Sequence, residues 1–174
     1  MNNLLWLQDD DFTIEQAQKG NVLCNNQKGI IFTLFHANPD KCQFSTATLP
    51  EFKKLALKMP GVKFGLCNLN KHPNVYFKSK DTIAPINNVP YIILYVNGRP
   101  LMRYDGEQKV DKMSLFLNDI VNRLNSKKDF FDTKNIKIES DVPNSSTSTQ
   151  FNVVCDSEKG ICYLNSSSAY PSMK

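Results

Sequence analysis

The sequence predicts an α/β protein in which helices flank a central mixed sheet, followed by a C-terminal extension. Strand-like apolar runs alternate with amphipathic, helix-like stretches through residues 1–125. Residues 30–36 are rich in β-branched and aromatic side chains, which is typical of a central strand buried on both faces. Asn97-Gly98 separates two strand-like runs and predicts a tight antiparallel hairpin. The expected order of elements is β-α-β-α-β-α-β-β-α.

Five strands are expected, at residues 4–7, 30–36, 62–69, 91–96 and 101–104. The first is a short apolar run, and the third alternates in the manner of a strand. The fourth is strongly apolar, and the fifth is its hairpin partner across Asn97-Gly98.

Four helices are expected, at residues 12–19, 49–59, 72–80 and 110–124. The first is expected to be short and to end at Gly20. In the second, Phe52, Leu55 and Met59 share one face, and Pro60-Gly61 stops the helix. The last repeats apolar side chains at helical spacing, as a closing amphipathic helix does.

Composition and charge exclude several classes of function. The chain has 174 residues, 41% of them hydrophobic, which suits one domain of about 100–150 residues plus an extension. The net charge is +4, but the lysines are scattered, so no nucleic-acid partner is expected. No run approaches the ~20 apolar residues of a membrane span, and the start lacks a signal peptide. The five widely spaced cysteines do not resemble a secreted disulfide framework, so a cytoplasmic location is expected.

The character of the chain changes near residue 125, which predicts a domain at 1–125 and a polar C-terminal extension at 126–174. Residues 127–141 are charged, and residues 144–149 form a run of Ser, Thr and Asn that buries too little to offset the entropy of ordering. Within the extension, residues 151–164 contain two apolar runs around a polar turn and form a candidate short hairpin.

Cys155 and Cys162 lie seven residues apart across that candidate turn. They are candidates for a disulfide or for a remote resolving thiol, and the alternative is that they fill a small apolar cluster. A zinc site would need two further thiol or imidazole ligands, and the only histidines are His36 and His72. No metal and no cofactor are therefore expected.

Cys42 is the first candidate for chemistry, because it lies between the buried strand and the second helix. Free N–H groups and the macrodipole at a helix N-terminus favour a thiolate over a thiol. Ser45, three residues later, stands where a two-cysteine redox site has its second sulfur. Such a site can attack a disulfide, but it has no neighbouring thiol to resolve the mixed disulfide. Cys24 and Cys67 are expected to be packed core thiols.

Three segments accompany Cys42 and the expected element order: Phe35-His36-Ala37, Leu49-Pro50-Glu51-Phe52 and Val89-Pro90-Tyr91. Together these features, over about residues 4–125, resemble the thioredoxin superfamily, and within it the thioredoxin and protein-disulfide-isomerase branch. The resemblance implies a cis peptide bond before Pro90, with the proline packed against the active-site sulfur. It also implies that an extended client pairs with the backbone at Val89, Pro90 and Tyr91.

The position of Pro50 decides which active-site role Cys42 takes in this resemblance. Pro50 lies eight residues after Cys42, which gives Cys42 the nucleophile position and Ser45 the resolving position. The alternative makes Cys42 the second cysteine, with Pro39 in place of the first, but it misplaces Pro50. The family's buried acid falls at Leu34, and its tryptophan before the cysteine is missing. Efficient general disulfide reduction is therefore not expected.

The segment Cys42-Gln43-Phe44-Ser45 also resembles the Cys-Gly-Phe-Ser site of monothiol glutaredoxins, which can hold an iron–sulfur cluster with glutathione. Here Gln43 replaces the small glycine, and the Gly-Gly-(Cys/Ser)-Asp motif that helps bind glutathione is absent. Cluster binding is the minor alternative.

Two classes of function stay open on the sequence. The favoured one is a non-catalytic scaffold that binds a protein partner through the Cys42/Pro90 surface or through the tail at 126–174. The alternative is a thiol–disulfide oxidoreductase, or a monothiol protein whose Cys42 forms mixed disulfides with client proteins. Similar degenerate thioredoxin-like proteins with added tails occur among large DNA viruses, and the Asn- and Lys-rich composition suits an AT-rich genome. A viral, virion-associated protein is the corresponding expectation.

Overall fold

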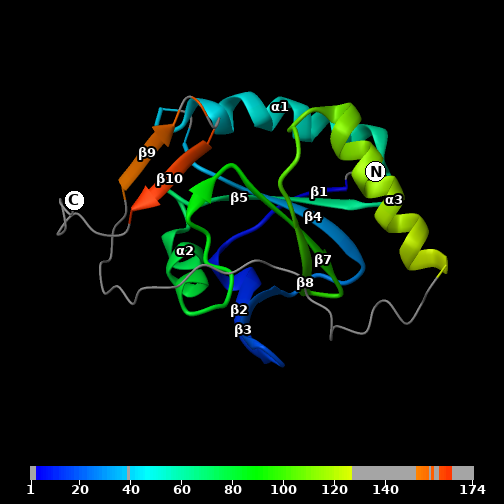
Figure 1. The fold of residues 1–174 in the computed structure, drawn as a ribbon, viewed down its shortest axis with the longest axis horizontal. Coiled ribbons are helices and arrows are strands. Elements are labelled where there is room, and N and C mark those ends of the chain that lie inside the picture. The colour runs from blue at the N-terminus through cyan, green and yellow to red at the C-terminus, as the bar shows by residue number, and fades with distance from the viewer. Residues whose placement is uncertain (1–2, 39, 127–151, 157, 159–160, 166–174) are drawn as a thin grey trace.

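The computed structural model describes residues 3–38, 40–126, 152–156, 158 and 161–165. Its centre is a five-stranded sheet in the order β1-β5-β4-β7-β8 (Figure 1). These strands are β1 (Leu4–Trp6), β4 (Ile30–His36), β5 (Lys63–Asn68), β7 (Tyr91–Val96) and β8 (Arg99–Tyr104). The predicted α/β architecture, a mixed central sheet flanked by helices, is confirmed.

The central strand β4 is buried on both faces, as its sequence predicts. It pairs in parallel with β5 and antiparallel with β7, so its backbone is satisfied along both edges. Successive side chains alternate between two hydrophobic clusters: Phe32 and Leu34 join one, and Ile31 and Phe35 join the other.

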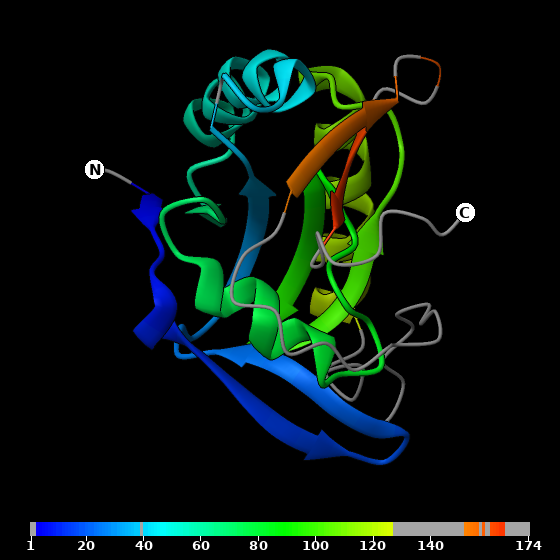
Figure 2. The same cartoon turned by 90° about the vertical axis from the view of Figure 1, so that its left-hand side faces the viewer.

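Helices cover both faces of the sheet (Figure 2). The helices α1 (Gln43–Lys58) and α3 (Val110–Ser126) pack on the face that holds Phe32, and α2 (Pro73–Lys80) packs on the opposite face. On the face covered by α1 and α3, Phe32 stacks on Phe52 of α1 with ring centroids 5.7 Å apart. Among the described residues, no helix has the length and apolar character that crossing a membrane requires.

The helix predicted at residues 12–19 is wrong. After a short 3-10 helix, η1 (Asp9–Asp11), the chain forms β2 (Phe12–Ala17) and β3 (Gly20–Asn25), an antiparallel hairpin. The physical reason is that buried and exposed side chains alternate every second residue, as in a strand. Phe12 and Ile14 turn inward, whereas Thr13 and Glu15 are exposed. Gly20, at φ 143°, adopts a backbone conformation that glycine tolerates, and the glycine expected to stop a helix follows a hairpin turn instead.

The hairpin predicted at Asn97-Gly98 joins β7 and β8 as expected. Asn97 has φ 51° and Gly98 has φ 86°, the two positive values that a tight two-residue turn requires. This turn makes the fifth strand antiparallel to its neighbour.

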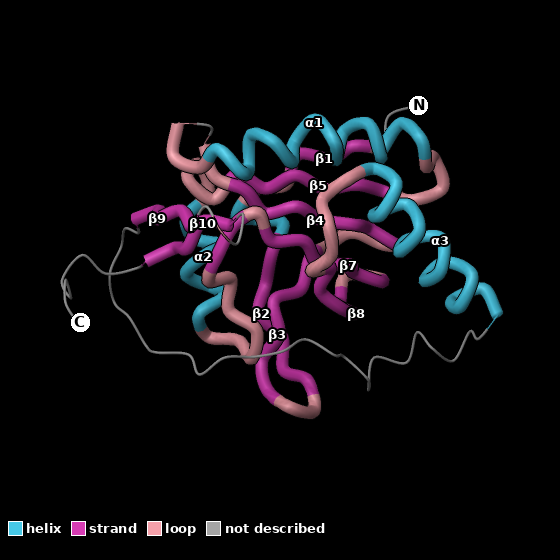
Figure 3. Tube along the Cα trace, turned by 45° about the horizontal axis from the view of Figure 1, so that its top comes forward, coloured by secondary structure: helices cyan, strands magenta, loops and turns pink. Residues whose placement is uncertain are grey.

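A second, three-stranded sheet contains the end of the described chain. Strand β10 (Ile161–Asn165) lies between β9 (Asn152–Asp156) and β6 (Asn88–Val89), and it is antiparallel to both. Figure 3 shows β9 and β10 beside α2. The polar runs predicted at 127–141 and 144–149 lie outside the described residues.

Candidate functional site

The side chains of Cys42, Cys155 and Cys162 converge, and we call them the sulfur cluster. Their sulfur atoms all lie within 4.8 Å of one another, although Cys42 and Cys162 are 120 residues apart in sequence. The structure joins Cys162 Sγ both to Cys42 Sγ and to Cys155 Sγ. Because one sulfur atom forms one disulfide at a time, these two bonds are alternatives that share Cys162.

Helix α1 and the loop before it position Cys42. The helix begins at Gln43, six residues before the predicted start, so Cys42 is its N-cap residue. The backbone N–H of Ser45 donates to Cys42 Sγ over 3.4 Å, and the N–H of Cys42 donates to the carbonyl of Asn38 over 3.0 Å. Asn38 is fixed in turn, because its side-chain oxygen accepts from Asn68 Nδ2 at 2.8 Å. The cysteine therefore sits at a helix start where the backbone N–H of Ser45 donates to the sulfur.

Ser45 is fully buried beneath this loop, with a defined structural contact. Its hydroxyl oxygen accepts a hydrogen bond from the backbone N–H of Ala37 at 3.2 Å. The side chain thus ties the start of α1 to the end of β4. A hydroxyl at this position braces the loop but supplies no sulfur for exchange.

Strand β10 brings Cys162 to the cluster by pairing with β6. Cys162 lies opposite Val89 in this pairing, and the N–H of Leu164 donates to the carbonyl of Asn87 at 2.7 Å. Cys162 and Leu164 are both buried in the hydrophobic cluster that also contains Cys42. The Tyr76 hydroxyl of α2 donates to the Leu164 carbonyl at 3.4 Å, a further link between the hairpin and the domain.

Cys155 completes the cluster from the outer strand of the hairpin. It lies directly opposite Cys162 in the β9–β10 register, and it is exposed, whereas Cys162 is buried. Its Sγ also lies 3.6 Å from the carbonyl of Lys41, just before the N-cap residue of α1. The hairpin therefore presents one buried and one exposed sulfur beside Cys42.

The predicted client-binding residues lie next to the cluster, but β10 already pairs with this edge. Val89, Pro90 and Tyr91 are all buried, and the peptide bond between Val89 and Pro90 is cis. The Arg103 guanidinium lies 4.4 Å from the centre of the Tyr91 ring. Because β10 pairs with Asn88–Val89, the chain's own C-terminal hairpin occupies the strand edge that the resemblance assigns to a client.

The other two cysteines, Cys24 and Cys67, are free and buried. Burial, reinforced by the charge of Glu15, raises the pKa of Cys24 to about 11. Burial likewise raises the pKa of Cys67 far above that of an exposed thiol. Both stay protonated at neutral pH, and a thiol without thiolate character is a poor nucleophile.

Leu34 and His36 lie in β4, the strand that precedes the Cys42 loop. Leu34, where the resemblance places a buried acid, is fully buried in the hydrophobic cluster that packs against α1. His36 is also buried, and burial lowers its pKa, so the ring is neutral and within reach of the Ala37 carbonyl at 3.2 Å.

The sulfur cluster is also a group that can hold a metal among the described residues. Three thiolates would leave one tetrahedral position of a zinc ion open. Metal ligands must be thiolates, however, and a disulfide in the cluster leaves one thiol at a time. With either disulfide formed, the cluster lacks the three thiolates that such a zinc site needs.

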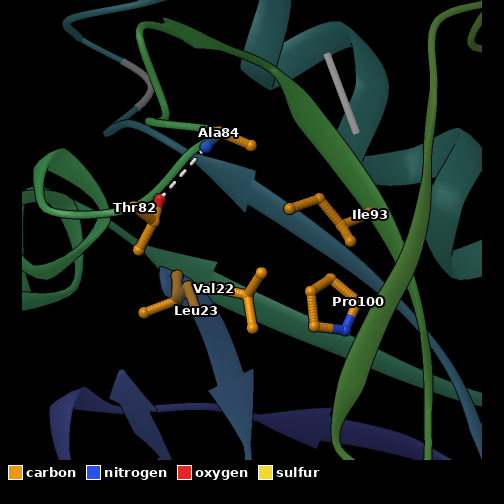
Figure 4. Close-up of a pocket in the computed structure, with 6 residues that line it drawn as sticks. All are labelled: Val22, Leu23, Thr82, Ala84, Ile93 and Pro100. Atoms are coloured by element: carbon orange, nitrogen blue, oxygen red, sulfur yellow. Dashed lines mark hydrogen bonds between the residues drawn. The ribbon is translucent and has the colours of Figure 1, made fainter. Parts of the chain in front are cut away.

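A small pocket elsewhere carries no comparable chemistry. It is lined by Val22, Leu23, Thr82, Ala84, Ile93 and Pro100 (Figure 4). None of these side chains is ionisable, and the Thr82 hydroxyl already accepts from the Ala84 N–H at 3.3 Å.

Sequence comparison finds similar proteins in two viruses. The chain is 26% identical over 125 residues to Uncharacterized protein 196R of Invertebrate iridescent virus 6, covering 69% of this chain and 72% of that protein. It is 25% identical over 178 residues to Uncharacterized protein 020R of Invertebrate iridescent virus 3, covering 96% of each. No family model matches the chain.

Structural comparison identifies the fold. A crystal structure of human ERp44 superposes with a TM-score of 0.50 at 18% identity, covering 68% of this chain. The chain spans 29% of the length of that ERp44 chain. Together with the sheet order and the helices on both faces, this likeness shows that the chain has a thioredoxin-like fold.

Sequence reasoning identified all three sulfurs as candidates and left open whether Cys155 and Cys162 pair with each other, act as a remote resolving thiol or fill an apolar cluster. What it missed is the pairing of β10 with β6, which links segments more than 70 residues apart. The available signal is local: Cys162 and Leu164, two residues apart, are both apolar enough to face a core. That signal predicts a buried strand face without naming the strand it pairs with.

Proposed function

We propose that this protein is a thiol–disulfide exchange protein in which Cys42 attacks a client disulfide and Cys162 resolves the mixed disulfide. The observation that supports this function is the sulfur cluster, where the structure pairs Cys162 with Cys42. The missing sulfur at position 45 is then replaced from the C-terminal hairpin. The resolving thiol comes from 120 residues away in sequence instead of three.

The exchange runs in two balanced steps from the fully reduced protein. In the first, the Cys42 thiolate attacks one client sulfur, the client S–S bond breaks, and the other client sulfur leaves as a thiolate. In the second, the Cys162 thiolate attacks Cys42 Sγ and expels the remaining client sulfur. The client gains two electrons and its thiolates take up protons, while the protein loses two electrons and holds a Cys42–Cys162 disulfide.

Two local contacts support Cys42 as the attacking sulfur. It caps α1, and the N–H of Ser45 donates to its sulfur. Both the donor and the positive end of the helix dipole stabilise negative charge on that atom. Cys24 and Cys67 lack such partners and are held as thiols by burial.

Client access requires β10 to leave the β6 edge, since the hairpin covers Cys42. In the reduced protein no covalent bond holds this strand. It is retained by its pairing with β6 and by burial of Cys162 and Leu164, and full burial of a leucine contributes about 1.5–3 kcal/mol. Small segments held by a few such contacts open locally without global unfolding. The client then pairs beside Val89 and Pro90 in place of β10.

Turnover of a disulfide-bonded peptide with dithiothreitol as the reductant tests this function. We expect Cys42→Ser to lower turnover at least about a hundredfold, to the rate of the reductant alone, because the attacking sulfur is gone. The matched control is Cys24→Ala, which removes a buried thiol outside the cluster and should leave turnover unchanged. Equal turnover by the wild type and Cys42→Ser would contradict the function.

The second candidate is the non-catalytic scaffold favoured by the sequence. The observation that supports it is the occupied strand edge, since β10 covers Cys42 and Leu34 replaces the family's buried acid. On this account the cluster is a structural disulfide, and the wild type shows no turnover above the reductant alone. The same assay therefore separates the two candidates.

The protein partner or client, the absence of a nucleic-acid partner, and the cytoplasmic or virion location all stay predictions. The viral source of the similar proteins supports a viral setting.

A further inference from the structure

The three sulfurs of the cluster differ sharply in access to solvent. Cys42 is 1% exposed and Cys162 is 0% exposed, whereas Cys155 lies on the exposed side of the hairpin. While β10 is paired with β6, an external thiol can therefore approach Cys155 but neither of the other two sulfurs. A Cys42–Cys162 disulfide, the product of the proposed reaction, is closed to a reductant in this arrangement.

We infer that Cys155 is a further catalytic residue, the outer thiol that receives the disulfide from Cys42 and passes it to an external dithiol reductant. This inference rests on the proposed function and adds its regeneration step. Its evidence is that Cys162 Sγ is joined to Cys155 Sγ as well as to Cys42 Sγ. Cys162 can therefore form a disulfide either with the buried Cys42 or with the exposed Cys155.

The first stage of the relay is an intramolecular disulfide exchange, which leaves the oxidation level of the protein unchanged. The Cys155 thiolate attacks Cys162 Sγ, the Cys42–Cys162 bond breaks, and Cys42 leaves as a thiolate. The direct cross-strand position of Cys155 and Cys162 places the attacking sulfur beside its target. The contact of Cys155 with the Lys41 carbonyl keeps the same sulfur near the start of α1. One disulfide is exchanged for another, and Cys42 is free again.

The second stage takes place at the surface. A thiolate of an external dithiol attacks Cys155 Sγ, the Cys155–Cys162 bond breaks, and Cys162 leaves as a thiolate. This leaves a mixed disulfide between the reductant and Cys155. The second thiolate of the reductant then attacks the reductant sulfur in that mixed disulfide and releases Cys155 as a thiolate. The reductant loses two electrons and becomes a disulfide, and the protein regains its three thiols. A dithiol supplies both of the thiolates that these two attacks need from one molecule, and a dithiol is therefore the reductant class that this relay takes.

Single-turnover and steady-state measurements on Cys155→Ser test this relay. Both the wild type and the variant are reduced, freed of reductant and mixed with excess disulfide-linked peptide. We expect each to reduce about one equivalent of peptide, because Cys42 and Cys162 are intact. When dithiothreitol is then supplied, the wild type should continue, and the variant should slow at least about tenfold and accumulate its Cys42–Cys162 form.

Three outcomes separate the possible failures. Steady-state turnover of Cys155→Ser equal to that of the wild type would overturn the relay and leave the proposed function standing. Absence of the first equivalent in both proteins would overturn the proposed function and the relay with it. A further measurement checks that burial of the disulfide is the cause. In buffer, dithiothreitol should reduce the oxidised variant more slowly than the oxidised wild type. In urea, where both proteins are unfolded, the two rates should be equal. A slow rate that persists in urea would also overturn the relay, since access would not be its cause.

Discussion

A Cys162→Ser variant is expected to stop after the first half of the reaction and to accumulate a covalent adduct between Cys42 and its client. The variant keeps the attacking sulfur at the N-cap of α1 but lacks the Cys162 sulfur that pairs with it. The mixed disulfide then lacks its resolving thiol, so its lifetime is set by how fast other thiols attack it. Intact mass measurement after acid quenching should show one client peptide per protein chain.

The residual resolution in that variant has a defined source. Cys155 Sγ lies within 4.8 Å of Cys42 Sγ, so it is the sulfur best placed to act in place of Cys162. We expect the double variant Cys155→Ser/Cys162→Ser to trap the adduct more completely than Cys162→Ser alone. Cys42→Ser is the matched control and should form no adduct. An adduct of equal yield on the Cys42→Ser protein, or none on the double variant, would contradict the assignment of Cys42 as nucleophile.

The two alternative disulfides are expected to stabilise the fold by very different amounts. The first joins residues 120 apart in sequence and the second joins residues seven apart. In the chain-entropy model, a disulfide stabilises by restricting the unfolded chain, which gives about 5 kcal/mol for the long loop and about 2 kcal/mol for the short one. Oxidised Cys155→Ser, which can form the long loop, should therefore be more stable to unfolding than oxidised Cys42→Ser, which can form the short one.

Urea unfolding of these two variants measures that difference. Each variant is compared with its own reduced form, so the effect of the substitution cancels. The gain on oxidation should be about 2.5 kcal/mol larger for Cys155→Ser than for Cys42→Ser. Equal gains would mean that the Cys42–Cys162 bond does not link the hairpin to the domain in solution.

Local patterns predict much of this fold because they report burial directly. The two-sided strand at Ile30–His36 and the turn at Asn97-Gly98 are confirmed, since each depends on its own residues. The helix predicted at 12–19 is wrong because the inward spacing of two, at Phe12 and Ile14, is too short a pattern to exclude a helix, and Gly20 suits a turn as readily as a helix end. The length of α1 was underestimated because its first turn, from Gln43, lacks an apolar stripe.

The candidate site was harder to predict than the fold, for a physical reason. Cys42 is marked by its neighbours in sequence, and Cys155 and Cys162 are marked by the hairpin that carries them. Their meeting depends on β10 pairing with a two-residue strand beside Pro90, a contact set by register across more than 70 residues. No periodicity within either segment encodes that register. Residues 127–151, which stand between α3 and β9 in the sequence, lie outside the described part of the chain.

Disulfide mapping of the oxidised, full-length wild type tests the shared role of Cys162 most directly. The protein is alkylated under acid quench, digested without reduction and analysed by mass spectrometry, with Cys24 and Cys67 as internal controls that stay free. We expect Cys162 in a disulfide in every oxidised chain, joined to Cys42 or to Cys155, with the third cysteine of the cluster alkylated. Free Cys162 in the oxidised protein, or a bond between Cys42 and Cys155, would contradict the account.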